Sequence, residues 1–159
     1  MIEVIIAISV IIVGVTAAFS LINKGLSLTI DFSDKLTAVY LAQEGIEIVR
    51  NIRDTNWTKN PPVDWNVGLG AGDWKADYND NILATYGETF LNFDGNFYSY
   101  DSGTRTKFRR KINVSSLTTE YAGVAPGYLL VTVTVEWLTG GNDTKSFTVA
   151  DRLYGWYNQ

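Results

Sequence analysis

The first 22 residues constrain this chain most, because they form an apolar run with a single charged side chain, Glu3. At about 1.5 Å per residue, residues 4–22 would form a helix of just under about 30 Å, the thickness of the hydrocarbon core of a bilayer. A carboxylate at the start of such a segment is costly in lipid and therefore indicates a functional site. The segment predicts a helix long enough to cross a membrane.

A secretory signal peptide and an ordinary membrane anchor are two other interpretations of this N-terminal segment, and each leaves part of its charge pattern unexplained. A secretory signal peptide has a basic start and a shorter apolar region, whereas here the first charge is acidic and Lys24 follows the apolar run. An ordinary membrane anchor fits the length, although no Lys or Arg precedes the segment to set its orientation. We expect that a basic leader has been removed, which would account for this charge pattern.

The composition argues against the common catalytic and metal sites. The chain of 159 residues contains neither histidine nor cysteine and carries a net charge of -4. Zinc sites of the usual Cys/His kinds and mechanisms that rely on a catalytic histidine are therefore excluded. We expect a protein that is not an enzyme and that needs no cofactor, with calcium as the one metal worth considering.

The helix pattern continues beyond Lys24. Apolar and small residues recur at steps of three and four and form one stripe: Ala38, Leu41, Ala42, Gly45, Ile46, Val49 and Ile52. Charged residues lie on the opposite face, and pairs such as Glu47/Arg50 and Arg50/Asp54 have the spacing of helix-stabilising ion pairs. Asn56-Trp57 and then Pro61-Pro62 end the pattern, so one helix of about 55 residues is predicted.

The rest of the chain predicts antiparallel strands. Residues 57–86 lack a clear period and are interpreted as a connecting region. Asp94-Gly95 predicts a hairpin between residues 89–93 and 96–100. Alternating apolar residues then predict strands over 108–114, 128–137 and 147–153, with Phe108, Arg110, Ile112 and Val114 on one face of the first of these three. The predicted fold class is α+β: a long N-terminal helix packed on one antiparallel sheet.

At this point the chain resembles the type IV pilin family and the pseudopilins of type II secretion, most closely their minor-pilin branch. The resemblance rests on Ile2-Glu3-Val4 opening the apolar helix, on residues 42–47 (AQEGIE) and on residues 50–54 (RNIRD). It implies the pilin fold, with residues 1–24 as the transmembrane or filament-core helix and 25–56 as its amphipathic continuation. Residues 57–159 would be the globular part, with a variable loop over 57–86 and the sheet over 87–159.

The resemblance also implies a function: a structural subunit of a type IV pilus or pilus-like filament. Such a subunit resides in the cytoplasmic membrane, is cut by a prepilin peptidase, and is assembled by inner-membrane machinery into an extracellular homo-oligomeric filament at the cell surface, where the globular part sets adhesion. The alternatives are a single-pass membrane-anchored binding module and a minor pseudopilin that does not form the bulk of a filament.

Assembly would depend on the start of the helix. When helices bundle, a buried carboxylate must find a partner or become neutral, and in the family the partner is the N-terminal ammonium group of a neighbouring subunit. The residues expected to carry assembly are Met1, Glu3, Val4, Ile5, Ile8, Ile12 and Gly14. In the family the glutamate is the fifth residue of the mature chain, whereas Glu3 is the third, which leaves N-terminal methylation open.

Two further groups of side chains are candidate sites. Asp77, Asn79, Asn81, Thr85 and Glu88 have the spacing of oxygen ligands in a calcium-binding loop. Ile82 stands where that loop requires glycine, so a solvated turn is the favoured interpretation. Five cations form a basic cluster that would suit DNA: Arg105, Lys107, Arg109, Arg110 and Lys111. The alternatives are a solvated strand edge and ion pairs with acids of the helix or of the next subunit.

Overall fold

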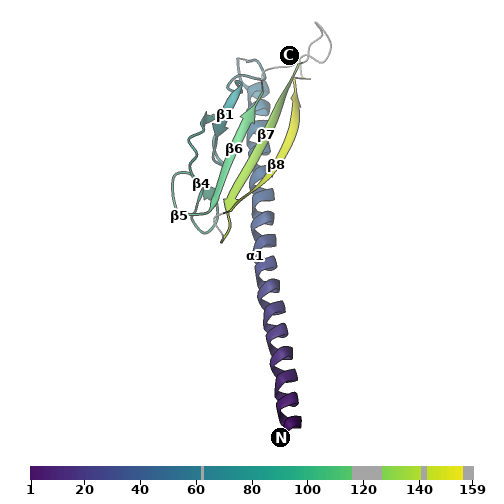
Figure 1. Cartoon of the computed structure of the whole chain (residues 1–159). Coiled ribbons are helices and arrows are strands. Elements are labelled where there is room, and N and C mark those ends of the chain that lie inside the picture. Colours follow the sequence, from purple (N-terminus) through teal and green to yellow (C-terminus); the bar gives the residue numbers. More distant parts are fainter. Residues whose placement is uncertain (62, 116–126, 141–142, 156–159) are drawn as a thin grey trace. The chain divides into compact units, whose positions relative to one another are not determined.

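The computed structural model describes residues 1–61, 63–115, 127–140 and 143–155. Contacts divide the chain into a first unit, Met1–Leu36, and a second unit, Thr37–Gln159. Helix α1, Ile2–Thr58, begins in the first unit and ends in the second (Figure 1). Its end lies directly after the predicted end at Asn56-Trp57; Pro62, which was expected to help end the helix, lies outside the described residues.

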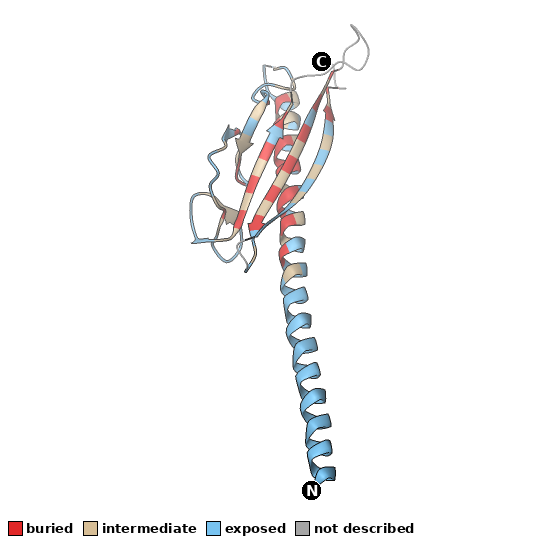
Figure 2. Cartoon of the chain, viewed as in Figure 1, coloured by how far each residue is buried: buried red, intermediate tan, exposed pale blue. Residues whose placement is uncertain are grey.

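The first unit is helical from Ile2 onward, and each of residues 1–30 is exposed (Figure 2). No proline interrupts α1, so its ladder of backbone hydrogen bonds can run without a break. Gly14 and Gly25 stand inside this helix and have open space around the position of a Cβ atom. Neither glycine is therefore required by close packing within the unit.

The second unit contains a five-stranded antiparallel sheet with the order β2-β1-β6-β7-β8. Its long strands are β6 (Phe108–Val114), β7 (Tyr128–Leu138) and β8 (Thr144–Tyr154), which correspond to the three strands predicted from alternation. The short strands β1 (Gly72–Lys75) and β2 (Ala84–Thr85) extend the sheet beyond β6 (Figure 1). The α+β class is confirmed.

A separate three-stranded sheet has the order β4-β3-β5, with β3 at Asn92–Phe93, β4 at Tyr98–Ser99 and β5 at Thr104–Arg105. The predicted hairpin around Asp94-Gly95 is present, with Phe93 opposite Tyr98. The Asp94 carboxylate closes the turn by accepting hydrogen bonds from the backbone N–H groups of Asn96 and Phe97, at 2.7 and 2.8 Å. The hairpin thus belongs to this small sheet, and the prediction of a single sheet is wrong.

Two of the five strands of the large sheet lie in the segment 57–86, which was interpreted as a connecting region. β1 pairs with β6 through Trp74 opposite Ile112, and β2 pairs with β1 through Thr85 opposite Trp74. These strands are short, and β1 begins with Gly72 and Asp73, residue types that are depleted in strands. β1 is paired by the backbone of β6 and β2 by the backbone of β1, so no local alternation predicts these two strands.

The core of the second unit lies between α1 and the large sheet. All seven residues of the predicted helix stripe are buried, and Ile48 joins them without having been predicted. Along β7 the buried residues are the alternate ones that the sequence predicted: Leu129, Val131, Val133, Val135 and Trp137 (Figure 2). Side chains of the helix and of the sheet form one hydrophobic cluster. The apolar stripe of α1, with its period of 3.6, and the alternate apolar residues of the strands, with their period of 2, are therefore buried in the same core.

Gly45 lies at a close approach between α1 and the large sheet. A Cβ atom at this position would lie 2.8 Å from Cγ1 of Val133 and 3.2 Å from Cδ of Arg110. Carbon atoms pack at about 3.5–4.0 Å, so the helix can lie this near to β7 and β6 only because residue 45 has no side chain. Gly45 therefore sets the depth at which α1 packs on the sheet.

Candidate functional site

The residues expected to carry assembly are exposed in the single chain. Val4, Ile5, Ile8 and Ile12 are 52% to 64% exposed. Met1 is fully exposed. Large aliphatic side chains in a soluble environment are normally covered, and a continuous exposed set of them marks an interaction surface or a membrane segment. The first unit therefore presents an apolar helix surface that nothing within the unit covers.

The polar side chains of this helix are largely satisfied by its own backbone. The hydroxyl groups of Ser9, Thr16, Ser27 and Thr29 each donate a hydrogen bond to the carbonyl group four residues earlier, at 2.8 to 3.1 Å. Such back-bonding hides the hydroxyl proton from an apolar environment. These four residues can therefore face lipid or other helices without an unsatisfied donor.

Glu3 differs from those residues, because it has no partner among the described residues. It lies in the first turn of α1, where the positive end of the helix dipole favours a carboxylate. It is exposed, as are its neighbours. By length and composition α1 could cross a membrane, a criterion that a signal sequence near an N-terminus also meets.

The predicted basic cluster does not form one patch, because Arg110 is buried with no exposed surface. Its Nη1 donates to a Glu44 carboxylate oxygen at 2.8 Å and to the Leu41 carbonyl at 3.2 Å, and its Nη2 donates to the Ala76 carbonyl at 2.6 Å. The prediction of Arg110 as a surface cation is wrong. The alternation of β6 already placed Arg110 on the inward face, beside Phe108 and Ile112, and this signal should have removed it from the patch.

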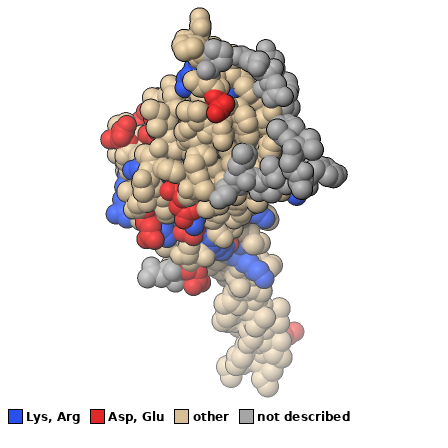
Figure 3. All heavy atoms as spheres, turned by 90° about the horizontal axis from the view of Figure 1, so that it is seen from above, with Lys and Arg blue, Asp and Glu red and all other residues tan. Residues whose placement is uncertain are grey.

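The other four cations of the cluster have separate surroundings. Arg109 pairs with Glu136 at 3.1 Å, and Lys111 lies 3.8 Å from Asp73. The Arg105 guanidinium stacks over the Phe90 ring at 4.1 Å, and the Lys107 ammonium lies 6.0 Å from the centre of the Phe108 ring. Acidic and basic side chains are interspersed on the face shown in Figure 3. This arrangement gives no extended basic track of the kind that holds a nucleic-acid backbone.

The two carboxylates of the calcium hypothesis, Asp77 and Glu88, each have another partner in the structure. Asp77 is buried and accepts hydrogen bonds from the Tyr100 backbone N–H at 2.9 and 3.1 Å. Glu88 lies 4.0 Å from Arg109, and Thr85 is part of β2. Asn79 and Asn81 lie in the turn between β1 and β2. Among the described residues no group of three or more acidic side chains could hold a metal ion, so the structure lends the calcium hypothesis no support.

Asp77, Tyr100 and Arg110 form a buried polar junction instead. The Tyr100 hydroxyl donates to the Arg110 carbonyl at 2.9 Å. Burial raises the pKa of Tyr100 to about 12, and burial likewise raises the pKa of Asp77, against the opposing effect of the Tyr100 N–H bond. The junction therefore joins α1, the segment after β1 and strand β6 through one arginine.

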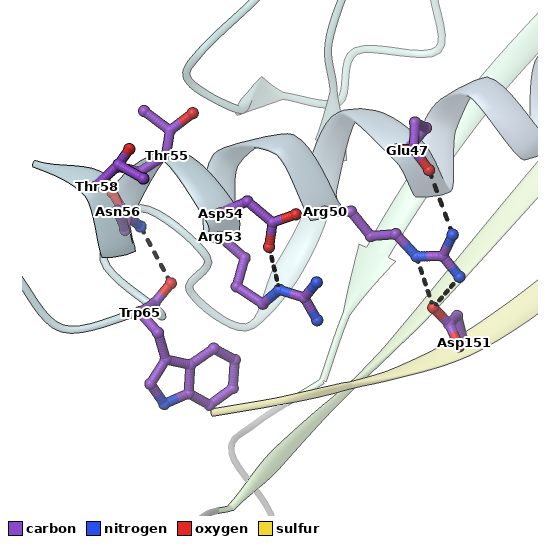
Figure 4. A network of polar contacts seen from close by, with 9 residues as sticks. All are labelled: Glu47, Arg50, Arg53, Asp54, Thr55, Asn56, Thr58, Trp65 and Asp151. Atoms are coloured by element: carbon purple, nitrogen blue, oxygen red, sulfur yellow. Dashed lines mark hydrogen bonds and ion pairs between the residues drawn. The ribbon is translucent and has the colours of Figure 1, made fainter. Parts of the chain in front are cut away.

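A second polar network lies between α1 and β8 (Figure 4). Nη2 and Nε of Arg50 donate to one carboxylate oxygen of Asp151, at 2.7 and 3.1 Å, and Nη1 donates to Glu47 at 3.3 Å. The hydrogen bond to Asp151 raises the pKa of Arg50. The expected Glu47/Arg50 pair is present, whereas Asp54 contacts Arg53 at 2.8 Å. The contact with Asp151 spans 101 residues of sequence and has no local signal.

Comparison of the chain with protein-family models, with curated proteins and with solved structures finds no match.

Proposed function

We propose that this protein is a structural subunit of a type IV pilus or a related pilus-like filament, polymerising through its N-terminal helix. One observation carries the proposal: a single helix, α1, joins an exposed apolar segment to a segment whose apolar stripe is buried on an antiparallel sheet. The second half of α1 has its partner within the chain. The first half needs a partner outside it.

The hydrophobic effect sets the free energy that covering the first half of α1 would contribute. Covering a Val, Leu or Ile side chain that was exposed contributes about 1.5–3 kcal/mol. The first unit exposes more than a dozen large apolar side chains, from Met1 to Phe32. In this proposal the cytoplasmic membrane covers these side chains before assembly, and the helices of neighbouring copies cover them afterwards. The four back-bonded hydroxyl groups suit both environments.

Glu3 would supply the axial register of the copies. Apolar helices alone can slide past one another, because dispersion and hydrophobic contacts are not directional. A carboxylate taken out of water must pair or become neutral, so it favours the one register that brings a cation to it. As the resemblance implies, the partner in the filament would be the N-terminal ammonium group of another copy.

The second unit would form the outer part of the filament and set adhesion and the choice of partners. In this proposal the work of assembly is done by inner-membrane machinery and maturation by a prepilin peptidase, as the resemblance implies. The role is structural and not catalytic. The rival function is a membrane-anchored binding module that never polymerises, or a minor pseudopilin that contributes few copies.

Replacing Glu3 separates these functions. We expect Glu3→Ala to abolish filaments that can be sheared from cells, while the protein stays in the membrane fraction at its normal level. Asp64→Ala is the matched control, because it removes an exposed carboxylate from the second unit. Filaments of normal number and length in Glu3→Ala cells would refute the register role.

Intact mass of the sheared material decides between a major and a minor subunit. A filament that consists mainly of this chain makes it a major subunit, and the same mass identifies its N-terminus and any methylation. A membrane fraction that holds the protein while sheared filaments lack it would favour the anchored module or the minor pseudopilin.

A further inference from the structure

Two adjoining hollows line one side of α1 in the second unit. One, of about 330 Å³, is bordered by Thr37, Tyr40, Leu41, Glu44 and Tyr98. The other, of about 280 Å³, is bordered by Glu44, Glu47, Ile48, Asn51 and Tyr78. They share Glu44, and the helix residues that border them extend along α1 from Thr37 to Asn51. This pair of hollows is called the tyrosine groove below.

The tyrosine groove has aromatic walls at the surface. Tyr40 is 63% exposed, and Tyr78 is 45% exposed with its ring stacked on Phe97 at 4.5 Å between centroids. Leu41 and Ile48 form an apolar floor, since both are buried. Aromatic faces carry negative partial charge and attract cations, most strongly where a site is partly shielded from water.

The carboxylates of the groove add to this preference. Glu44 is neutralised by the buried Arg110, at 2.8 Å. Among the described ion pairs, Glu47 and Asp151 share Arg50, so this one guanidinium serves two carboxylates. The Glu47 side chain is 71% exposed and is free to accept further hydrogen bonds. Aromatic rings beside an incompletely neutralised carboxylate are the surroundings that a guanidinium or ammonium group prefers.

Arg105 of the same chain is a cation that could bind in the tyrosine groove of another copy. Four arginines of the second unit, Arg50, Arg53, Arg109 and Arg110, have a carboxylate partner. Arg105 is exposed, its guanidinium stacks over the Phe90 ring, and it has no carboxylate partner among the described residues. It lies on β5, at the edge of the small sheet, where a second molecule can reach it. An exposed guanidinium already held against a ring is pre-oriented for a further contact.

We propose that the tyrosine groove of one copy receives the Arg105 side chain of a neighbouring copy, which would make this contact a lateral bond of the filament; the proposal rests on the proposed function. The groove and Arg105 are different surfaces, so the contact is heterologous and each copy offers both halves. A heterologous contact that does not close into a ring continues indefinitely, as a filament requires.

Charge exchange tests the contact. Close charge pairs across interfaces couple strongly enough to change association about tenfold or more. Arg105→Glu and Glu47→Arg should each lower the amount of sheared filament at least about tenfold, and the double variant should restore it. Lys145→Glu is the matched control, because it reverses an exposed cation on β8. A double variant no better than the worse single variant would overturn the proposal.

Engineered cysteines give a second, direct measurement. The chain has no cysteine, so any disulfide must come from introduced residues. Filaments of the Asn51→Cys/Thr104→Cys variant should give a ladder of covalent multimers after oxidation, whereas either single variant should give none. Filaments that form normally without a ladder or charge rescue would overturn the groove contact and leave the proposed function standing. If the unaltered chain forms no filaments, both proposals fail.

Discussion

The buried pair of Arg110 and Glu44 allows the sharpest test of how α1 is held on the sheet. In Glu44→Gln the side chain keeps its shape and an acceptor atom but loses its charge. The Arg110 guanidinium would then remain buried with the carbonyl groups of Leu41 and Ala76 as its described neutral acceptors. A buried charge that loses its paired carboxylate is costly, and the attraction of Asp77 offsets part of this cost, so the folded state should lose stability.

The structure sets the magnitude. Removing one partner of a buried ion pair costs about 3–5 kcal/mol. The Glu44 side chain is 31% exposed, and glutamine still accepts a hydrogen bond, so we expect a loss somewhat smaller than this range, about 2–3 kcal/mol. For a unit of this size each kcal/mol lowers Tm by about 3–5 °C, which gives a fall of roughly 10 °C.

The assay is thermal unfolding of the full chain in detergent, followed by near-ultraviolet circular dichroism. The five tryptophans of the chain report on tertiary packing in this signal. Glu47→Gln is the matched control: it lies one turn away, its side chain is 71% exposed, and its ion pair with Arg50 is a surface pair. Such pairs contribute about 0–1 kcal/mol, so the control should change Tm by only a few degrees.

Equal effects of Glu44→Gln and Glu47→Gln would refute the reasoning, because they would mean that the buried guanidinium does not depend on its counter-charge. The double variant Glu44→Leu/Arg110→Met provides a second criterion. Replacing a whole buried pair with apolar residues of similar size is often neutral or stabilising. The double variant should therefore be more stable than Glu44→Gln.

Two further predictions use the same unfolding assay. Gly45→Ala should destabilise the second unit by about 1–2 kcal/mol, because the new Cβ atom would lie 2.8 Å from Val133. Gly25→Ala is the control and should be neutral or slightly stabilising, because the space around Gly25 is open. Equal effects of the two substitutions would contradict the close approach of helix and sheet. Tyr100→Phe should cost about 1 kcal/mol at pH 7 through loss of the hydrogen bond to the Arg110 carbonyl. Burial raises the pKa of Tyr100 from 10.0 to about 12, so the neutral phenol contributes stability below pH 10 that is lost as the pH rises through 12. The difference between Tyr100→Phe and the unaltered protein should therefore shrink between pH 10 and 12, and a constant difference would count against a buried phenol.

Local periodicity was enough to predict the main elements of this fold. The stripe from Ala38 to Ile52 predicted the buried face of α1, and alternation predicted β6, β7 and β8. Both patterns are set by the geometry of a single element, 3.6 residues per helical turn and two per strand repeat, so the sequence contains them in full. The exposed apolar start of α1 belongs to the same class of local signal.

Pairings between distant segments were decided only by the tertiary structure. Alternation had placed Arg110 on the inward face of β6, but the choice between a buried arginine and a surface patch depended on Glu44 and the Ala76 carbonyl reaching it. Asp151 reaches Arg50 from across the chain, and β1 became a strand because the edge of β6 was available to it. The free energy of these polar contacts depends on burial and on partners from distant parts of the chain. Folding creates both, so the local sequence alone does not reveal these contacts.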